Sequence, residues 1–305
     1  HGDISTNNVN NTSRSVFAEQ RTLRPAQNLY LLGVKILHHA AAFFGNLVPD
    51  SLGQRIGRNV MTPTIELLKA HRSIRQFENR PIATDLLHEL IQAGQAAASS
   101  SFLQAATIIR ISDPAKRASL AALANHQPYI ESAAEFLVFC ADMNRAARCC
   151  DWHDASANTG FTEQFIIATV DASLVAQNIV VAAESAGLGI CYIGALRNNP
   201  AEVSSLLELP QNTYPVFGLC LGWPDQDPEV KPRLPLEIVL RENSYGGDVD
   251  FDRLADYDDV IRAYYQTRSA NQKSQSWSEQ MAGMLSKESR PHMLNFLQES
   301  GFLLK

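Results

Sequence analysis

One long apolar segment, residues 161–186, constrains the fold more than any other part of the sequence. Apolar side chains lie on nearly every side of the helix that this segment would form, and Gly187 and Gly189 follow where a helix would end. Such a helix is buried in a protein or spans a membrane. Four polar residues interrupt the pattern: Asp171, Gln177, Asn178 and Glu184. These interruptions favour a protein core or a subunit interface over a membrane.

Short apolar or β-branched runs alternate with helical patterns along the rest of the chain. We expect strands at residues 107–111, 136–140, 190–193, 216–223 and 237–241. We expect helices at residues 84–97, 114–123 and 200–207, and near 251–267, 276–287 and 291–299. Because the strands are few and one helix dominates, an α+β layer fits better than a doubly wound sheet. A Rossmann NAD domain is unsupported, since no G-x-G-x-x-G follows a strand.

Composition places broad limits on function. The chain has 305 residues, 45% of them hydrophobic, and can bury the core of one large or two small domains. Its net charge of −6 argues against a nucleic-acid binder. The five cysteines form no C-x-x-C pair, which predicts reduced thiols and a cytoplasmic protein. Cysteine and histidine spacings show no metal-binding pattern, so no metal is expected.

Residues 1–60 differ from the rest of the chain. Residues 1–27 are polar and expected to be disordered, whereas residues 29–48 are apolar and long enough to span a bilayer. Lys35 lies inside that run, and a lysine at a helix centre costs roughly 2.5–3.5 kcal/mol on insertion, so no membrane association is expected. The first methionine is Met61. We interpret residues 1–60 as an N-terminal extension, either upstream translated sequence or a leader; a genuine amphipathic anchor is the alternative.

A basic segment follows a clear helix start. Thr62 suits an N-cap and Pro63 the first helical position, and the helix they begin gives way to His71-Arg-Ser-Ile-Arg75. Two guanidinium groups beside a hydroxyl suit a phosphate or an electron-rich heterocycle. The alternative is a solvated basic turn.

Many short motifs run in order from residue 61 to the C-terminus. They are Met61–Leu67, His71–Arg75, Ser99–Gln104, Ala133–Phe136, Ala176–Asn178, Ala182–Ser185, Tyr192–Gly194, Leu196–Asn199, Phe217–Pro224, Lys231–Pro235, Glu242–Tyr245 and Lys287–Pro291. Together they resemble the bacterial oxygen-insensitive NADPH nitroreductases of the major group A type, and the related NADPH-flavin oxidoreductases. The resemblance implies one domain over residues 61–305 with a nitroreductase-like α+β fold, in which helices flank a central, mainly antiparallel sheet. It also implies a homodimer with the 161–186 helix at its core and FMN at the interface.

FMN needs cations for its phosphate, hydrogen-bond partners for its pyrimidine edge, and positive charge near N1 of its reduced ring. The resemblance implies that Lys231, Arg233 and His71 hold the phosphate, with Ser73 and Arg75 nearer the N1/O2 edge. The other implied FMN-binding residues are Arg72, Ser99, Ser101, Gln127, Tyr192, Ile193, Gly194, Ala195 and Leu196. Judged without the resemblance, the Lys231–Pro235 stretch is a solvated connector and the serines cap a helix. Ala195 stands where the family has a second glycine, which puts the exact placement of the ring in doubt.

The stretch Tyr264–Arg268 matches a family segment whose arginine contacts the nucleotide. Lys273 stands where the family has another arginine, and it keeps the charge without the bidentate fork. The resemblance therefore implies that Arg268 and Lys273 bind the 2′-phosphate of NADPH from a mobile loop. The alternative is a solvated helix end with two incidental cations.

The resemblance implies a ping-pong cycle in which NADPH reduces FMN and leaves, after which two electrons pass to a nitroaromatic or a quinone. No side chain need act as a nucleophile. A flavin reductase that uses free FMN as acceptor is the first alternative, and a flavin-binding protein without turnover is the second. The chain is longer than the family pattern around residues 147–160, which we expect to be a surface loop.

Overall fold

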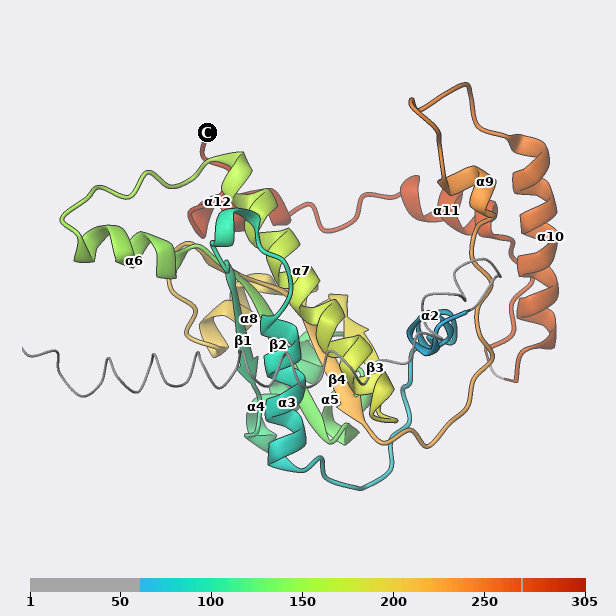
Figure 1. Cartoon of the computed structure of the whole chain (residues 1–305), viewed down its shortest axis with the longest axis horizontal. Coiled ribbons are helices and arrows are strands. Elements are labelled where there is room, and N and C mark those ends of the chain that lie inside the picture. Colours follow the sequence, from blue (N-terminus) through green and yellow to red (C-terminus); the bar gives the residue numbers. More distant parts are fainter. Residues whose placement is uncertain (1–60, 270) are drawn as a thin grey trace, which may run out of the picture. The chain divides into compact units, whose positions relative to one another are not determined.

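Four antiparallel strands form the central sheet of the protein, in the order β1-β2-β4-β3 (Figure 1). They are β1 (Ala106–Arg110), β2 (Glu135–Asp142), β3 (Gly189–Ile193) and β4 (Thr213–Gly222). The computed structural model describes residues 61–269 and 271–305, and the predictions made for residues 1–60 lie outside the described residues. The chain divides into the units His1–Met61 and Thr62–Lys305, and all four strands belong to the second. The α+β class and the antiparallel sheet are confirmed.

The helices expected from the sequence are present, with ends that differ by a few residues at most. They are α2 (Pro63–Lys69), α3 (Thr84–Gln95), α4 (Pro114–Leu123), α7 (Thr162–Ser185), α8 (Pro200–Leu206), α10 (Phe251–Thr267), α11 (Trp277–Leu285) and α12 (Met293–Glu299). Thr62 caps α2 as expected, since its Oγ1 accepts a hydrogen bond from the Ile65 N–H at 3.3 Å. Short elements that the sequence did not predict are α5 (Tyr129–Ser132), α6 (Asn144–Trp152) and the 3-10 turns η1 (Ser100–Phe102) and η2 (Gly194–Asn198).

Two of the predictions were wrong. The strand expected at residues 237–241 is instead the short helix α9 (Leu236–Val239). Leu236 is 65% and Val239 67% exposed, and no strand in the described part of the chain pairs with them. An apolar, β-branched run forms a strand only where another strand supplies its hydrogen bonds. The surface loop expected at residues 147–160 is helical up to Trp152. α6 buries none of its residues, so the segment lies at the surface as expected, but as a helix and not as a loop.

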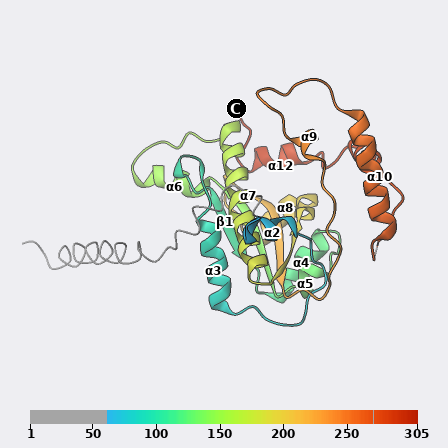
Figure 2. The ribbon, with the colours of Figure 1, turned by 45° about the vertical axis from the view of Figure 1, so that its right-hand side comes forward.

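Helices cover both faces of the sheet, and successive side chains of β2 point alternately toward the two helical layers. Phe136, Val138 and Cys140 face a core formed with α4, α5 and α8. Leu137 and Phe139 face the other way, into a core formed with α3 and α7. Successive side chains of a strand point to opposite faces, so this pattern places the sheet between two helical layers. Figures 1 and 2 both show α3 and α7 side by side on one face.

α7 packs closely on the sheet because its buried side is mostly alanine: Ala168, Ala172, Ala176 and Ala183 are fully buried. Gly94 permits the close approach of α3 to α7, since a Cβ at Gly94 would lie 2.6 Å from Cγ1 of Ile179. Gly187 has φ +80° just after the helix, as a left-handed C-terminal residue should. Among the described residues, α7 is the one helix long and apolar enough to cross a membrane. Its contacts with the sheet and α3 make it a core helix.

Candidate functional site

The basic segment His71–Arg75 lies along the edge of the sheet, beside β3. Ser73 forms a parallel bridge with Ile190, and the Ile74 N–H donates to the Ile190 carbonyl at 2.8 Å. Ile74 is buried, and a Cβ at Gly189 would lie 2.6 Å from its Cγ1. The sequence thus fixes the backbone of this segment by one apolar anchor and leaves the polar side chains on either side of it accessible.

Two of the basic side chains already have carboxylate partners. His71 Nδ1 lies 2.5 Å from Glu184 Oε1 near the end of α7, and Arg72 donates to Asp227 at 2.5 Å. Arg72, Asp227 and Glu184 line a pocket of about 600 Å³, whereas His71 does not. Among the predicted FMN-binding residues this pocket contains Arg72 alone, so it does not by itself gather the predicted site.

Arg75 is the available cation of the segment. It is exposed and forms no ion pair with any described residue, while its guanidinium carbon lies 6.0 Å from the centre of the Tyr129 ring. Burial raises the pKa of Tyr129, and the nearby Arg75 guanidinium opposes this shift. Burial also raises the pKa of the Cys191 thiol on β3, again opposed by Arg75. Arg75 therefore lies beside β3 and the start of α5. The predicted Gln127 precedes Tyr129 by two positions.

The predicted ring-contacting stretch, Tyr192 to Leu196, runs from the end of β3 into η2. Tyr192 is 36% exposed, and burial of its hydroxyl end, with Glu184 nearby, raises its pKa to about 12, so it remains a neutral donor. Ile193 and Leu196 are fully buried and could serve a ligand only through their backbones. Ala195 has no positive φ, so the methyl group that replaces the family glycine causes no backbone strain. Glu184 interacts with both His71 and Tyr192, so this stretch adjoins the basic segment.

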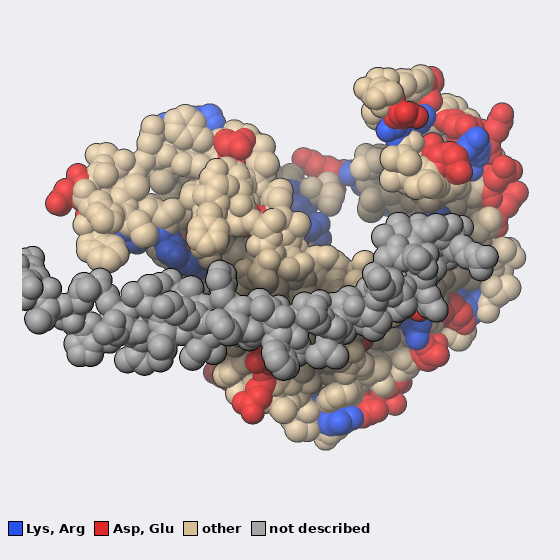
Figure 3. Space-filling model, in the orientation of Figure 1, with Lys and Arg blue, Asp and Glu red and all other residues tan. Residues whose placement is uncertain are grey.

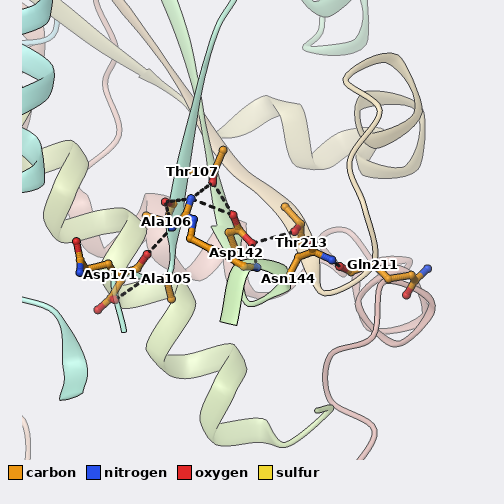
Figure 4. A network of polar contacts seen from close by, with 10 residues as sticks. Ala105, Ala106, Thr107, Asp142, Asn144, Asp171, Gln211 and Thr213 are labelled. Carbon is orange, nitrogen blue, oxygen red and sulfur yellow. Dashed lines mark hydrogen bonds and ion pairs between the residues drawn. The ribbon is translucent and has the colours of Figure 1, made fainter. Parts of the chain in front are cut away.

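The serines are held by a buried carboxylate in the middle of α7. The Ser99 hydroxyl donates to Asp171 at 2.6 Å, and the Ser100 and Ala105 N–H groups donate to the same carboxylate at 3.2 and 2.9 Å. The expectation that Ser99 caps a helix was therefore wrong, since its side chain makes no capping bond to η1. Ser101 is exposed with φ +48°. Figure 4 shows Asp171 bonded to Ala105 beside Asp142, which bonds Thr107, so two buried carboxylates hold the start of β1.

The structure does not bring the serines to the basic segment within one chain. Asp171 and Glu184 are thirteen positions apart on α7, which corresponds to roughly 20 Å along a helix. Ser99 and Ser101 accompany Asp171, whereas His71 accompanies Glu184. The serines and the basic segment of one chain therefore cannot belong to the same part of a ligand site.

The remaining predicted residues form a second cluster, at one end of α10. Lys231 Nζ, Arg268 Cζ and Lys273 Nζ lie 5.3, 4.6 and 5.8 Å from the centre of the Tyr265 ring. Arg233 lies next to them and donates to the Lys231 carbonyl at 2.9 Å. The structure thus joins two groups that the sequence treated separately, one expected to bind FMN and one expected to bind NADPH.

α10 has two different sides, which explains how it carries this cluster. Tyr257, Ile261 and Tyr265 are spaced four residues apart and are buried with Leu234 and Trp277 in a small core of their own. The opposite side is exposed and acidic, with Asp252, Asp256 and Asp259, and Figure 3 shows acidic side chains along this helix. In the part of the chain that the structure describes, no group of three His, Cys, Asp or Glu side chains is placed to hold a metal ion.

Sequence reasoning missed the residues that position the predicted ones: Tyr129, Asp171, Glu184, Asp227 and Tyr265. Two of these carried a signal. Asp171 and Glu184 interrupt an otherwise apolar helix, and a buried carboxylate needs donors from elsewhere in the chain. The others look like ordinary surface or core residues until the fold brings them into contact.

The chain matches two family models that together cover most of residues 61–305. Residues 68–223 match the Nitroreductase family, and residues 231–305 match the Nitroreductase family, C-terminal domain. An NADPH-flavin oxidoreductase of Vibrio harveyi is 49% identical over 79% of this chain and 98% of its own length. An oxygen-insensitive NADPH nitroreductase of Salmonella typhimurium is 46% identical over 79% of this chain and 99% of its own length.

Solved structures agree with these relatives. The NADPH:FMN oxidoreductase of Vibrio harveyi, complexed with NAD+, superposes with a TM-score of 0.73 at 47% identity, over 79% of this chain and 99% of that one. Nitroreductase A of Vibrio parahaemolyticus superposes with a TM-score of 0.75 at 46% identity, over 80% of this chain and all of that one. The nitroreductase-like fold expected from the sequence is therefore confirmed.

Proposed function

Because the chain belongs to the nitroreductase family, we propose that it is an FMN-dependent NADPH oxidoreductase that reduces nitroaromatics and quinones by two-electron ping-pong transfer. The observation that carries this proposal is the extent of the match. The chain covers 98–99% of relatives named NADPH-flavin oxidoreductase and oxygen-insensitive NADPH nitroreductase, at 46–49% identity.

The residues present fit FMN. Arg75 is an exposed cation near Tyr129 that forms no ion pair with any described residue, and it would stabilise negative charge on a reduced ring. Lys231 and Arg233 would bind the phosphate, which needs cations on a loop that is already ordered; Pro232 and Pro235 restrict that loop. When bound, FMN supplies the two-electron chemistry, and the side chains only bind, orient and balance charge.

A homodimer would complete the site. Ile166, Val170 and Leu174 are spaced four residues apart on α7 and are 42–48% exposed, and with Ser99 and Glu163 they line a shallow pocket of about 410 Å³. We propose that a second copy covers this apolar stripe, defined here as Ile166, Val170 and Leu174. Across such an interface, the serines of one chain could approach the basic segment of the other, which the distance along α7 prevents within one chain.

Val170→Arg is therefore expected to convert the dimer into monomers and to release FMN, because it places a charge in an interface that must exclude water. The molar mass from light scattering and the FMN content of the purified variant check this. Glu202→Arg, at an exposed position of α8 on the other face of the sheet, serves as the control and is expected to remain dimeric. A Val170→Arg protein that stays dimeric contradicts an interface at the apolar stripe.

Selectivity for NADPH over NADH is expected to depend on Arg268 and, less strongly, on Lys273. Arg268→Ala should raise the KM for NADPH by roughly 10–150-fold with little change for NADH, since a charged hydrogen bond contributes roughly 1.5–3 kcal/mol. Lys273→Ala should act in the same direction with a smaller effect, because lysine lacks the bidentate fork. Arg262→Ala is the control, since this half-buried arginine of α10 is paired with Asp259 and Glu279. If both variants keep the wild-type ratio of the two KM values, the 2′-phosphate binds elsewhere.

Residues 61–305 are proposed to carry the whole activity, in the cytoplasm, where the five free cysteines would remain reduced. Removing residues 1–60 is expected to leave the dimer, the FMN content and the rate of NADPH oxidation unchanged, because both family matches begin after residue 60. Purification of a chain that begins at Met61 checks this. Loss of soluble dimer on truncation would instead show that the extension takes part in folding.

The choice of acceptor separates three candidate functions. A nitroreductase oxidises NADPH with a higher kcat/KM for nitrofurazone or a quinone than for free FMN. The reverse preference identifies a flavin reductase, a candidate favoured by the 49% identity to the Vibrio harveyi NADPH-flavin oxidoreductase. The absence of NADPH oxidation with every acceptor would leave a flavin-binding protein without turnover and would overturn the proposal.

A further inference from the structure

Tyr265 is the residue around which the cations of the α10 cluster are arranged. Its ring is 3% exposed and packs in the small core of α10 and α11, and its hydroxyl donates to Gln280 Oε1 at 3.2 Å. The three cations next to the ring come from two segments far apart in the sequence. Lys231 precedes α9, whereas Arg268 and Lys273 lie in the connection between α10 and α11.

These cations are not neutralised by the protein. None of the three forms an ion pair with a described residue; the Glu229 carboxylate, which accepts from the Ser269 N–H at 3.0 Å, interacts with Arg268 only from a distance. The Nε of Arg268 is buried and has no hydrogen-bond partner among the described residues. Like charges repel, so their convergence needs a compensating group, and the face of an aromatic ring attracts cations.

Lys231 and Arg268 lie within roughly 10 Å of each other through their shared ring, about one Debye length at 0.1 M salt. The electrostatic interaction between the two side chains is therefore only partly screened by salt. Although burial raises the pKa of Tyr265, its interactions with Lys231, Gln280 and Lys273 outweigh burial and lower that pKa overall, which agrees with a strongly positive environment.

We propose that Tyr265 is a positioning residue that holds Lys231, Arg268 and Lys273 in one anion-binding cluster, which serves both the phosphate of FMN and the 2′-phosphate of NADPH. The proposal rests on the function proposed above and adds a link between its two phosphate sites. Tyr265 itself is expected to touch neither ligand. It acts by keeping cations from two distant segments close enough together to bind phosphate groups.

The test measures binding of two probes by calorimetry, FMN and adenosine 2′,5′-bisphosphate, with adenosine 5′-monophosphate as the probe that lacks the 2′-phosphate. Tyr265→Leu is expected to weaken binding of both phosphate probes by about tenfold and to leave the monophosphate unaffected. Tyr265→Phe keeps the ring and should retain the wild-type affinities. Tyr264→Leu is the matched control and should bind both probes normally. Tyr264 adjoins Tyr265 on α10, but it meets the three cations only through its carbonyl, which accepts from the Arg268 N–H and is kept in the variant.

Lys231→Met keeps the test decisive if Tyr265→Leu does not fold, because Lys231 is exposed. A shared cluster predicts that this variant also binds adenosine 2′,5′-bisphosphate more weakly. The inference is overturned if Lys231→Met or Tyr265→Leu affects only one of the two probes, or if Tyr265→Phe is as impaired as Tyr265→Leu. A wild-type protein that binds no FMN would instead overturn the proposed function.

Discussion

Asp171→Ala is expected to lower the free energy of unfolding by roughly 3–5 kcal/mol, since three hydrogen bonds to a buried charged group are lost and their effects are not fully additive. The carboxylate is buried and accepts from the Ser99 hydroxyl and from the Ser100 and Ala105 N–H groups. Without it, the Ala105 N–H has no acceptor where β1 begins. Urea denaturation at fixed protein concentration measures the change.

Asp151→Ala is the control for this prediction. Asp151 lies on α6 and pairs with Arg148, and both side chains are exposed, so its removal should change stability by less than about 0.5 kcal/mol. If Asp171→Ala is as stable as this control, the carboxylate does not hold the start of β1. Asp171→Ala should also lose FMN, because residues 99–101 would be less ordered and their serines are proposed to contribute to a site across the dimer.

Arg75→Ala is expected to weaken FMN binding by roughly 10–150-fold, the range that corresponds to one charged hydrogen bond of about 1.5–3 kcal/mol. It should also lower the reduction potential of the bound flavin, because positive charge beside the ring stabilises the anionic reduced form. Fluorescence titration of the FMN-free protein and a potentiometric titration of the loaded protein measure the two effects.

Two further variants serve as comparisons for Arg75→Ala. Arg75→Lys keeps the charge without the planar fork and should lie between the wild type and Arg75→Ala. Arg80→Ala removes a neighbouring arginine whose guanidinium lies 3.7 Å above the Trp223 ring, outside the candidate site, and should retain FMN. Equal FMN affinity in Arg75→Ala and the wild type would remove Arg75 from the site.

The sequence predicted best what depends on local pattern. α7 was placed to within one residue at each end, because its apolar run is continuous and Gly187 ends it. The strand at residues 237–241 failed because strand formation depends on a partner strand that the local sequence does not reveal. Helix α6 was missed for a different reason. The chain is longer than the family pattern there, which suggested a loop, although Ala146, Cys149 and Cys150 recur at helical spacing.

The candidate site was predictable in residue type and less so in arrangement. The resemblance identified cations such as Arg75 and Lys231, but their neighbours come from distant parts of the chain. His71 and Glu184 are 113 positions apart, and Lys231 and Tyr265 are separated in the sequence by α9. Contacts at such separations depend on the fold and cannot be inferred from spacing. For the same reason, only the structure shows that the serines lie far from the basic segment of their own chain.

Anaerobic titration of the purified protein with NADPH tests whether the chain is an FMN-dependent NADPH oxidoreductase. We expect a yellow protein with about one FMN per chain, whose visible flavin absorbance is lost on addition of about one NADPH per FMN and restored by nitrofurazone or a quinone. A colourless protein that does not bind added FMN, or a bound flavin that NADPH cannot reduce, would contradict it.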